Sequence, residues 1–373
     1  MNHSFDFGIE EEYFIFQKKN GDLRGSMSSL FYSSAKAALG DHVGRELLQS
    51  QIEVATTPCS STAEARRQLL HFRRTLDEIA TGHRLGILAA GTHPTADWEH
   101  QRPTEQTRYG KLAHDLQMIA RRKMICGMHV HVAVPEGVSR VDLMVRMLPF
   151  VPLFLALSTS SPFWHSHRTG LMGYRQALYA ELPRSGLPDL FRDDADYDAY
   201  VGALIENRIV TDASFIWWAV RPSAVYPTLE LRVADSCTHV EDALAIAALY
   251  RCLVRRLIRD DTLNRGLTSA ARAIIEENKW RAQRYGIHGS LIDLATGEAK
   301  PIALVLSDAI ALVEPDAEAL GCAAEVASLA KIMERGTSAD QQLEVYRAAL
   351  AAGASAPQAL ACVVGWLAET TVH

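Results

Sequence analysis

Four segments of the chain alternate between apolar and charged side chains, and this period of two residues is typical of β-strands that bury one face. They read FGIEEEYFIF at 7–16, QIEVAT at 51–56, MHVHVAV at 128–134 and TLELRVAD at 228–235. Because alternate residues of a strand point to opposite sides, each segment has one apolar face and one face with ionisable groups. A chain with four such strands is expected to form a sheet that packs on helices through its apolar face.

The charged faces of the four segments carry the same kinds of side chain. They bear Glu10, Glu12, Glu53, His129, His131, Glu230 and Arg232. Glu11 is an exception, because it falls on the apolar side of the first segment with Ile9 and Tyr13. One interpretation is a solvated sheet face, but such a face is expected to consist mainly of lysine, threonine and serine. The carboxylates and imidazoles favour a second interpretation, a metal site.

Clustered carboxylate oxygens suit Mg²⁺ or Mn²⁺, with imidazole as a supplementary ligand, and proteins often share such ions with the phosphates of a nucleotide. Zinc hydrolysis is a weaker interpretation. His129 and His131 lack the i, i+4 spacing of helical zinc-protease motifs, and no third histidine or cysteine completes an obvious set. The sequence does not decide which of the two is a ligand, because a core histidine bonded to a backbone carbonyl is a common alternative.

A bound nucleotide would be held by metal ions and arginines, because the usual phosphate loops are missing. The chain has neither a Walker lysine loop nor a GxGxxG motif. Arg221, Arg232 and the segment ENKWRAQRYG at 277–286 are the candidates to contact phosphates. That segment contributes Asn278, Lys279, Arg281 and Arg284. Taken alone, it is also typical of the solvated end of an amphipathic helix.

Helical segments separate the strands. The pairs Ser61 with Glu64 and Thr238 with Glu241 have capping-box spacing and predict the starts of two long helices, the second running to about residue 259. The apolar run 147–157 contains two prolines, is too short to span a bilayer and reads as a buried helix. Strands and helices at irregular spacing, without repeated βαβ units, predict an antiparallel or mixed sheet covered by helices on one face.

The chain becomes helical from about residue 300. The predicted helices lie near 314–335, 338–352 and 357–369. Gly336 and Gly353 are expected to act as stops, and Ser338 with Gln341 as a further capping box. This tail has little polar chemistry, so we expect it to pack on the rest of the protein.

Composition limits the function classes. The net charge is −6 and the sequence has no long basic block, so nucleic-acid binding is not expected. Six cysteines without CxxC spacing indicate neither a zinc ribbon nor a disulfide framework, and reduced, mostly buried thiols are expected. The first residues lack the basic region and apolar core of a secretory signal, so we expect a cytoplasmic protein without a membrane partner.

Seven motifs follow one another in the order, and at roughly the spacing, of a known family. They are GIEEEY, QIEVAT, AAGTHP, GMHVHVAV, SSPFWHSHRTG leading to YR, RPSAVYPTLELRVAD and WRAQRYG. In these motifs the chain resembles the type-2 glutamate–cysteine ligase family of bacterial ATP-dependent carboxylate–amine ligases. The resemblance covers about residues 5–300 strongly and the helical tail loosely.

The resemblance implies a glutamine-synthetase-like α+β fold, in which the concave polar face of a curved, mainly antiparallel sheet holds Mg²⁺ and ATP. Residues 1–300 would form this catalytic core, and residues 301–373 a helical segment packed on the same domain. The implied metal ligands are Glu10, Glu12, Glu53, Glu230, one of His129 and His131, and Glu46. Arg232 would contact the transferred phosphate, Arg284 the nucleotide phosphates and Arg175 a substrate carboxylate.

The implied reaction activates a carboxylate, of glutamate or a similar amino acid, as an acyl phosphate that an amine then attacks. Arg232, Glu53 and Glu230 would be the catalytic residues, and weak glutamate–cysteine ligase activity in a homodimer is expected. Two alternatives remain open from fold-level analogy: a phosphotransferase of the guanidino-kinase type, and a metal- and nucleotide-binding protein without turnover.

Overall fold

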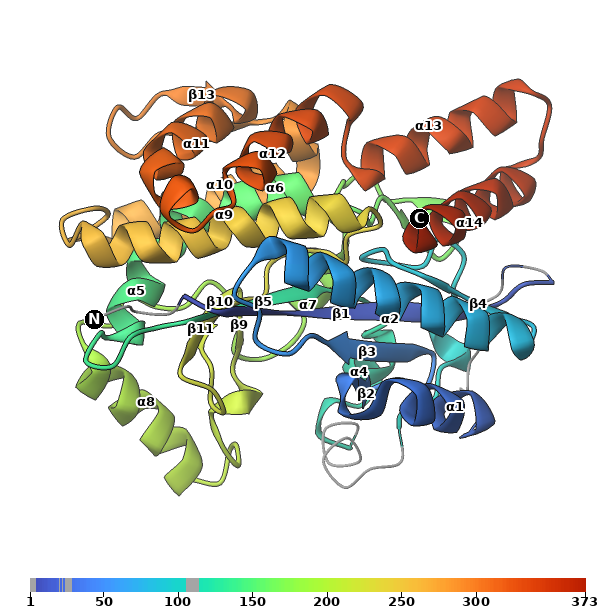
Figure 1. The fold of residues 1–373 in the computed structure, drawn as a ribbon, viewed down its shortest axis with the longest axis horizontal. Coiled ribbons are helices and arrows are strands. Elements are labelled where there is room, and N and C mark those ends of the chain that lie inside the picture. Colours follow the sequence, from blue (N-terminus) through green and yellow to red (C-terminus); the bar gives the residue numbers. More distant parts are fainter. Residues whose placement is uncertain (1–4, 20, 22, 24–28, 105–113) are drawn as a thin grey trace.

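The four alternating segments lie side by side in one sheet, as the sequence predicts. The computed structural model describes residues 5–19, 21, 23, 29–104 and 114–373. Within these residues the sheet has seven strands in the order β10-β11-β5-β1-β3-β2, with β4 paired to β1, and all its pairings are antiparallel (Figure 1). The strands are β1 (Phe7–Gln17), β2 (Val43–Arg45), β3 (Gln51–Ala55), β4 (Leu85–Leu88), β5 (Met128–Ala133), β10 (Val220–Pro222) and β11 (Thr228–Leu231).

Helices cover one face of this sheet in two layers. The helices α2 and α9 lie against the sheet, and α11 and α12 pack on the outer side of α9 (Figure 1). The helices up to α9 are α1 (Ser29–Leu39), α2 (Thr62–Gly82), α4 (Met118–Arg122), α5 (Arg140–Met147), α6 (Val151–Ser158), α7 (Arg175–Tyr179), α8 (Asp194–Glu206) and α9 (Val240–Arg259). The later ones are α10 (Ser269–Tyr285), α11 (Ile302–Ala319), α12 (Ala323–Arg335), α13 (Ser338–Ala351) and α14 (Ala356–Val372).

The C-terminal helices predicted from composition are present and pack on the core. The helix α14 contacts α13, α2 and β4, which places the end of the chain beside the sheet (Figure 1). Three short strand pairs lie outside the main sheet: β6 (Phe163–Trp164) with β7 (His167–Arg168), β8 (Ser185–Gly186) with β9 (Trp217–Trp218), and β12 (Ser290–Ile292) with β13 (Ala299–Pro301). Helices combined with an antiparallel sheet confirm the predicted α+β fold class.

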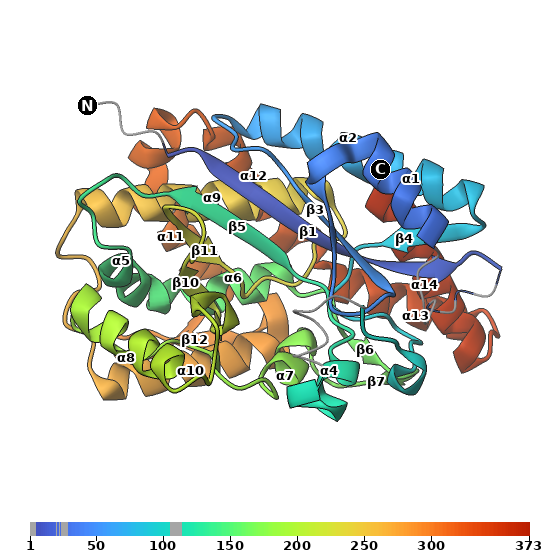
Figure 2. The same cartoon turned by 90° about the horizontal axis from the view of Figure 1, so that it is seen from below.

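The two faces of the sheet divide as the alternation predicts. Ile9, Ile52, Val130 and Leu229 are fully buried in the core beneath the helices. The opposite face carries the charged side chains, and β1 and β5 are uncovered by helices over most of their length when the molecule is seen from below (Figure 2). The buried face fixes the register of each strand, because a slip of one residue would exchange the two faces.

Two local predictions are wrong. The last charged strand ends at Leu231, so Arg232 lies one residue beyond it, where its backbone N–H donates to the carbonyl of Ala219. Thr238 does not cap α9, because its hydroxyl instead donates to the carbonyl of Ala89 at 2.7 Å, and His239 is the residue before the helix.

The other capping boxes are close to their predicted positions. At the start of α2 the side chain of Ser61 accepts a hydrogen bond from the backbone N–H of Glu64, as predicted, but the side chain of Glu64 accepts from the backbone N–H of Ser60 instead of Ser61. The box at the start of α13 uses Thr337 with Asp340, one residue before the predicted pair Ser338 and Gln341.

The apolar run after residue 140 is a core helix. Arg140–Ser158 is long and apolar enough to cross a membrane by length and composition, yet 78% of this window is buried inside the fold. Such burial is typical of a central helix in a folded core. Five of the six cysteines are buried and Cys362 is exposed, which confirms the predicted burial of most of the thiols.

Glu11, the carboxylate on the helix side of β1, is neutralised inside the core. Its two oxygens accept hydrogen bonds from Arg73 of α2 at 2.5 and 3.0 Å, and both side chains are fully buried. The hydroxyl of Tyr13 also donates to Glu11. Arg73 donates further to the carbonyls of Cys237 and Thr238. This pair therefore ties the central strand to α2 and to the residues that precede α9.

We expect Glu11→Gln to lower the free energy of unfolding by about 3–5 kcal/mol, because it leaves the buried guanidinium of Arg73 without its counter-charge. Urea unfolding of the metal-free protein measures this loss. The matched control is Glu241→Gln, which breaks the exposed pair of Glu241 with Arg66 and should cost no more than about 1 kcal/mol. Equal losses in the two variants would contradict a structural role for Glu11.

Candidate active site

Strand register places the ionisable side chains of the open face opposite one another. The directly paired residues are Glu12 with Glu53, Glu10 with His129, Glu230 with His131, and Arg221 with Glu230. Side chains of directly opposed residues have Cβ atoms about 5 Å apart, so these groups interact. The site is thus built mainly from side chains of neighbouring strands.

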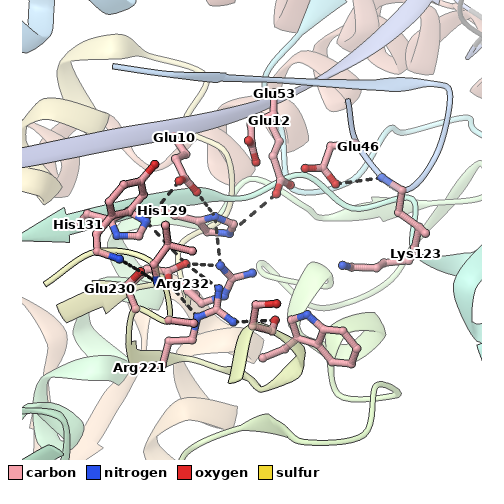
Figure 3. Close-up of a pocket in the computed structure, with 17 residues that line it drawn as sticks. Glu10, Glu12, Glu46, Glu53, Lys123, His129, His131, Arg221, Glu230 and Arg232 are labelled. Atoms are coloured by element: carbon pink, nitrogen blue, oxygen red, sulfur yellow. Dashed lines mark hydrogen bonds and ion pairs between the residues drawn. The ribbon is translucent and has the colours of Figure 1, made fainter. Parts of the chain in front are cut away.

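These residues line one pocket with a volume of about 260 Å³ (Figure 3). The sequence-predicted residues among its walls are Glu10, Glu12, Glu46, Glu53, His129, His131, Arg221, Glu230 and Arg232. Glu46 enters from the loop after β2, and its carboxylate accepts a hydrogen bond from the backbone of Leu47 at 3.2 Å. The pocket also includes groups that sequence reasoning missed, among them Lys123, Trp217 and Tyr226.

One half of the pocket has its carboxylates paired with arginine or histidine side chains. Glu230 accepts from Arg221 at 2.8 Å and also from Arg232. Burial acts to raise the pKa of Glu230, but the charges of Arg232 and Arg221 outweigh it and hold the pKa well below its ordinary value. Glu10 lies 3.0 Å from Nδ1 of His129 and 3.3 Å from Nε2 of His131. Burial opposes ionisation of Glu10 too, yet hydrogen bonds to both imidazoles hold its pKa well below the ordinary value.

The other half contains carboxylates that mainly face one another. Burial and the charge of Glu46 raise the pKa of Glu12 to about 7. Burial and the charges of Glu10 and Glu46 raise the pKa of Glu53 well above its ordinary value. Glu12 does accept one hydrogen bond, from the backbone N–H of Gly127 at 2.7 Å. Two directly opposed carboxylates destabilise a sheet unless a cation lies between them.

His129 lies between the two halves. Burial lowers its pKa to about 3, so the imidazole is neutral at physiological pH. Its Nδ1 lies 3.0 Å from a carboxylate oxygen of Glu10, an acceptor, and 3.4 Å from Arg232, a donor, and the shorter contact favours a proton on Nδ1. The other nitrogen, Nε2, is buried without a hydrogen-bond partner and lies 3.8 Å from a carboxylate oxygen of Glu12. A neutral imidazole whose Nδ1–H is held by a carboxylate is the usual form of a metal-ligating histidine.

Two sets of side chains in the described part of the chain have the geometry to hold a metal ion. Glu10, His129 and Glu230 form one set, and Glu12, Glu53 and His129 form the other; within each set the possible ligand atoms lie within 4.8 Å of one another. Carboxylate oxygens with one imidazole suit Mg²⁺ and Mn²⁺. The unpartnered Nε2 of His129 and the repulsion between Glu12 and Glu53 both fit a cation at this point.

Arg175 lies at the bottom of a small extension of the pocket. Its side chain is 1% exposed, and it donates to the carbonyls of Arg232 and Val233 at 3.3–3.4 Å, while its Nε is buried without a partner. The guanidinium occupies space that only glycine leaves free, since a Cβ on Gly127 would lie 2.1 Å from it. The extension is also lined by Lys123 and Tyr179.

Two predicted nucleotide contacts lie away from this pocket. Asn278 lines a separate cavity, and its side-chain amide donates to and accepts from the backbone of Ile292. Arg284 stacks on the ring of Tyr285, 4.9 Å from the centroid, near the end of α10. Asn278 and Arg284 both belong to α10, and neither lines the pocket that contains the carboxylates. Their role in binding nucleotide stays a prediction.

Solved structures show the fold to be shared with ligases. A bifunctional glutathione synthetase from Pasteurella multocida superposes with a TM-score of 0.73 and 14% identity, over 98% of this chain and 52% of that one. A glutamate–cysteine ligase from Francisella tularensis in complex with AMP superposes with a TM-score of 0.70 and 14% identity. This match covers 99% of this chain and 89% of that one. At this identity the likeness establishes the fold alone, which the chain shares with a class of ligases.

Sequence comparison gives the family within this class. Residues 6–359 match the family described as Glutamate-cysteine ligase family 2. The chain is 47% identical to "Putative glutamate--cysteine ligase 2" of Bradyrhizobium diazoefficiens over 99% of its length and 84% of the relative's. A protein of the same name from Rhodospirillum rubrum is 44% identical, over 99% of this chain and 96% of the relative. The chain belongs to glutamate–cysteine ligase family 2, and it is therefore an ATP-dependent carboxylate–amine ligase.

We expect Glu53→Gln to leave the melting temperature of the metal-free protein unchanged or to raise it, by about 1–2 °C for each kcal/mol of repulsion relieved. The same variant should lose at least half of the rise in melting temperature that Mn²⁺ produces. Thermal melts in EDTA and in Mn²⁺ measure both effects, with exposed Glu298→Gln as the matched control. A lower melting temperature together with the full Mn²⁺ response would mean that Glu53 is structural.

Proposed function

We propose that this enzyme transfers the γ-phosphate of ATP to a substrate carboxylate and then exchanges that phosphate for an amine. The proposal rests above all on one observation: two possible ligand sets share His129 in a pocket that also holds Arg221 and Arg232. A reaction between two anions needs such a concentration of positive charge. Among the described residues that line the pocket, no side chain belongs to a recognisable nucleophile motif, and this chemistry requires none.

Within this proposal the carboxylates and His129 hold divalent ions. Glu12, Glu53 and Nε2 of His129 would hold one ion, with Glu46 nearby, and Glu10 and Glu230 would contribute to a second. His129 is favoured over His131 as a ligand, because both possible ligand sets contain His129 and neither contains His131. Mg²⁺ at these positions would neutralise the phosphates and bring them close to the carboxylate.

The arginines have separate roles in the proposed reaction. Arg232 is held by Glu230 and Tyr179 and would stabilise the phosphoryl group during transfer. Arg221 donates a hydrogen bond to Glu230 and lines the pocket together with Arg232. Arg175, whose Nε has no partner, would bind a carboxylate of the substrate. Fixed guanidinium groups stabilise developing charge without reorganising, which is the main source of catalysis in phosphoryl transfer.

The proposed chemistry balances in two steps. A carboxylate oxygen attacks the γ-phosphorus, the bond to the β–γ bridging oxygen breaks, and ADP leaves. The amine nitrogen then attacks the acyl carbon, the bond to the phosphate oxygen breaks, and the amine loses a proton. Glutamate or a similar amino acid is the proposed carboxylate substrate, with glutamate–cysteine ligation as one outcome. A cytoplasmic homodimer remains the predicted form of the enzyme.

A hydroxylamine trap tests the acyl phosphate. With ATP, Mg²⁺ and a panel of amino acids that includes glutamate, we expect one hydroxamate for each ADP released, because hydroxylamine captures only an activated acyl group. Hydroxamate is measured as its ferric complex and ADP by a coupled assay. Phosphorylation of a guanidino substrate without hydroxamate from any acid would instead support a phosphotransferase and refute this proposal.

Arg232→Lys tests the role of the guanidinium. Lysine keeps the charge but loses the planar fork that binds two oxygens, so we expect kcat to fall on the order of 100-fold or more. Mg-ATP should bind within about tenfold of wild type, since the other cations remain. Steady-state rates and nucleotide titrations measure the two quantities. Near-normal turnover would remove Arg232 from the mechanism.

A further inference from the structure

Asp235 is a buried carboxylate that the proposed chemistry has not used. It lies between β11 and α9, is fully buried, and lines neither the main pocket nor the extension that holds Arg175. Its Oδ2 accepts hydrogen bonds from the backbone N–H of Ser160 at 3.0 Å and from the hydroxyl of Ser161 at 2.6 Å. Hydrogen bonds to an ionised oxygen are shorter and stronger than those between neutral groups. Asp235 therefore fixes the position of the Ser161 hydroxyl.

Ser161 connects Asp235 to the backbone of Arg175. Its Oγ accepts a hydrogen bond from the backbone N–H of Arg175 at 3.0 Å, while its own proton is donated to Asp235. The backbone of Ser161 also forms hydrogen bonds with that of Met172 and that of Tyr174, both at 3.1 Å. Arg175 is the first residue of α7, so its backbone is held at the point where this helix begins.

Two glycines leave the space that this arrangement occupies. A Cβ on Gly91 would lie 2.5 Å from Oδ2 of Asp235, and a Cβ on Gly127 would lie 2.1 Å from the guanidinium of Arg175. Gly91 follows β4 and Gly127 precedes β5, and Gly127 also forms an isolated β-bridge with Asp235. Asp235 and Arg175 therefore both pack against backbone next to the main sheet, at positions where a larger residue would collide with them.

The charges of Asp235 and Arg175 act on each other. Burial raises the pKa of Asp235 to about 6, although the charge of Arg175 and the hydrogen bonds from Ser161 and Ser160 oppose the shift. The charge of Arg175 also acts on Glu12 in the main pocket. Within the described part of the chain, Oδ1 of Asp235 has no hydrogen-bond partner. The guanidinium thus interacts with one carboxylate of the pocket and with a second one, Asp235, that lies outside it.

We infer that Asp235 is a positioning residue for Arg175: acting through the hydroxyl of Ser161, it sets where the guanidinium meets the carboxylate of the substrate. This inference rests on the proposed function, in which Arg175 binds that carboxylate. A displaced guanidinium keeps its charge but forms its hydrogen bonds at poorer distances and angles, and hydrogen bonds weaken steeply outside their preferred geometry. Loss of the connection should therefore weaken binding of the carboxylic acid more than binding of ATP.

The experiment measures hydroxamate formation at about pH 8, two units above the pKa of Asp235, against the concentration of the best amino acid from the hydroxamate panel. ATP, Mg²⁺ and hydroxylamine are kept saturating. We expect Ser161→Ala and Asp235→Ala each to raise the KM for this acid about tenfold, the value of one charge-assisted hydrogen bond, and to change the KM for ATP less than about threefold. The double variant should be no worse than the worse single variant, because both substitutions break one connection.

Asp235→Asn is the conservative variant, because its amide oxygen still accepts from Ser161, and it should keep the KM for the acid within about threefold of wild type. Thr159→Val is the matched control. Thr159 is a fully buried hydroxyl residue two positions before Ser161, but its Oγ1 donates to Thr337 at 3.0 Å. It should lower the melting temperature to a similar extent as Ser161→Ala and leave the KM for the acid unchanged. If Asp235→Ala does not fold, Ser161→Ala and Asp235→Asn still decide the test.

Four results would overturn the inference. They are a wild-type KM for the acid in Ser161→Ala, losses that add in the double variant, an Asp235→Asn variant as impaired as Asp235→Ala, and a raised KM for the acid in Thr159→Val. Hydroxamate formation by wild type separates these results from failure of the proposed function. Absence of hydroxamate from wild type would refute the proposed function, and the inference with it.

Discussion

Like charges on the open face of β1 repel one another, and the fold holds them in place through the opposite face of the same strand. Glu10 and Glu12 belong to the pocket, whereas Glu11, between them, is locked to Arg73 in the core. The bond between Glu11 and Arg73 is rigid because both groups are fully buried and their hydrogen bonds are satisfied by each other and by backbone. The strand cannot slip to relieve the repulsion without placing charges among apolar side chains.

The pocket distributes its charge unevenly, and this asymmetry indicates where ions belong. Glu230 is balanced by two arginines, so it can remain ionised without metal and keep Arg232 oriented. Glu12 and Glu53 lack such partners, and burial makes their ionisation costly. A divalent cation can offset the cost of ionising these carboxylates where several ligand atoms already lie close together. Glu12, Glu53 and the unpartnered Nε2 of His129 form such a group. Ion binding therefore offsets the cost of ionising Glu12 and Glu53.

Period-two alternation was sufficient to assemble most of the site from sequence, because it fixes which side chains of a strand share a face. It could not supply strand order or register, and it extended the last strand by one residue to Arg232. The predicted cap by Thr238 was wrong because of a contact distant in sequence: its hydroxyl donates a hydrogen bond to the carbonyl of Ala89. The basic segment of α10 is helical, and the alternation rule used for the strands does not say where a helix lies relative to the sheet. The position of Asn278 in another cavity was therefore not predictable from the sequence.

The residues that sequence reasoning missed share one property, which is that they lie off the strands of the main sheet. Lys123 follows α4, Tyr179 ends α7 and Trp217 belongs to the short strand β9, so only tertiary structure brings them together. The sheet supplies the carboxylates and arginines that an ATP-driven activation of a carboxylate needs. The segments between its strands supply the pocket walls that contact a particular substrate. Substitutions in these connections can therefore change the amine that is accepted while the carboxylate face, which is constrained by the core beneath it, keeps its chemistry.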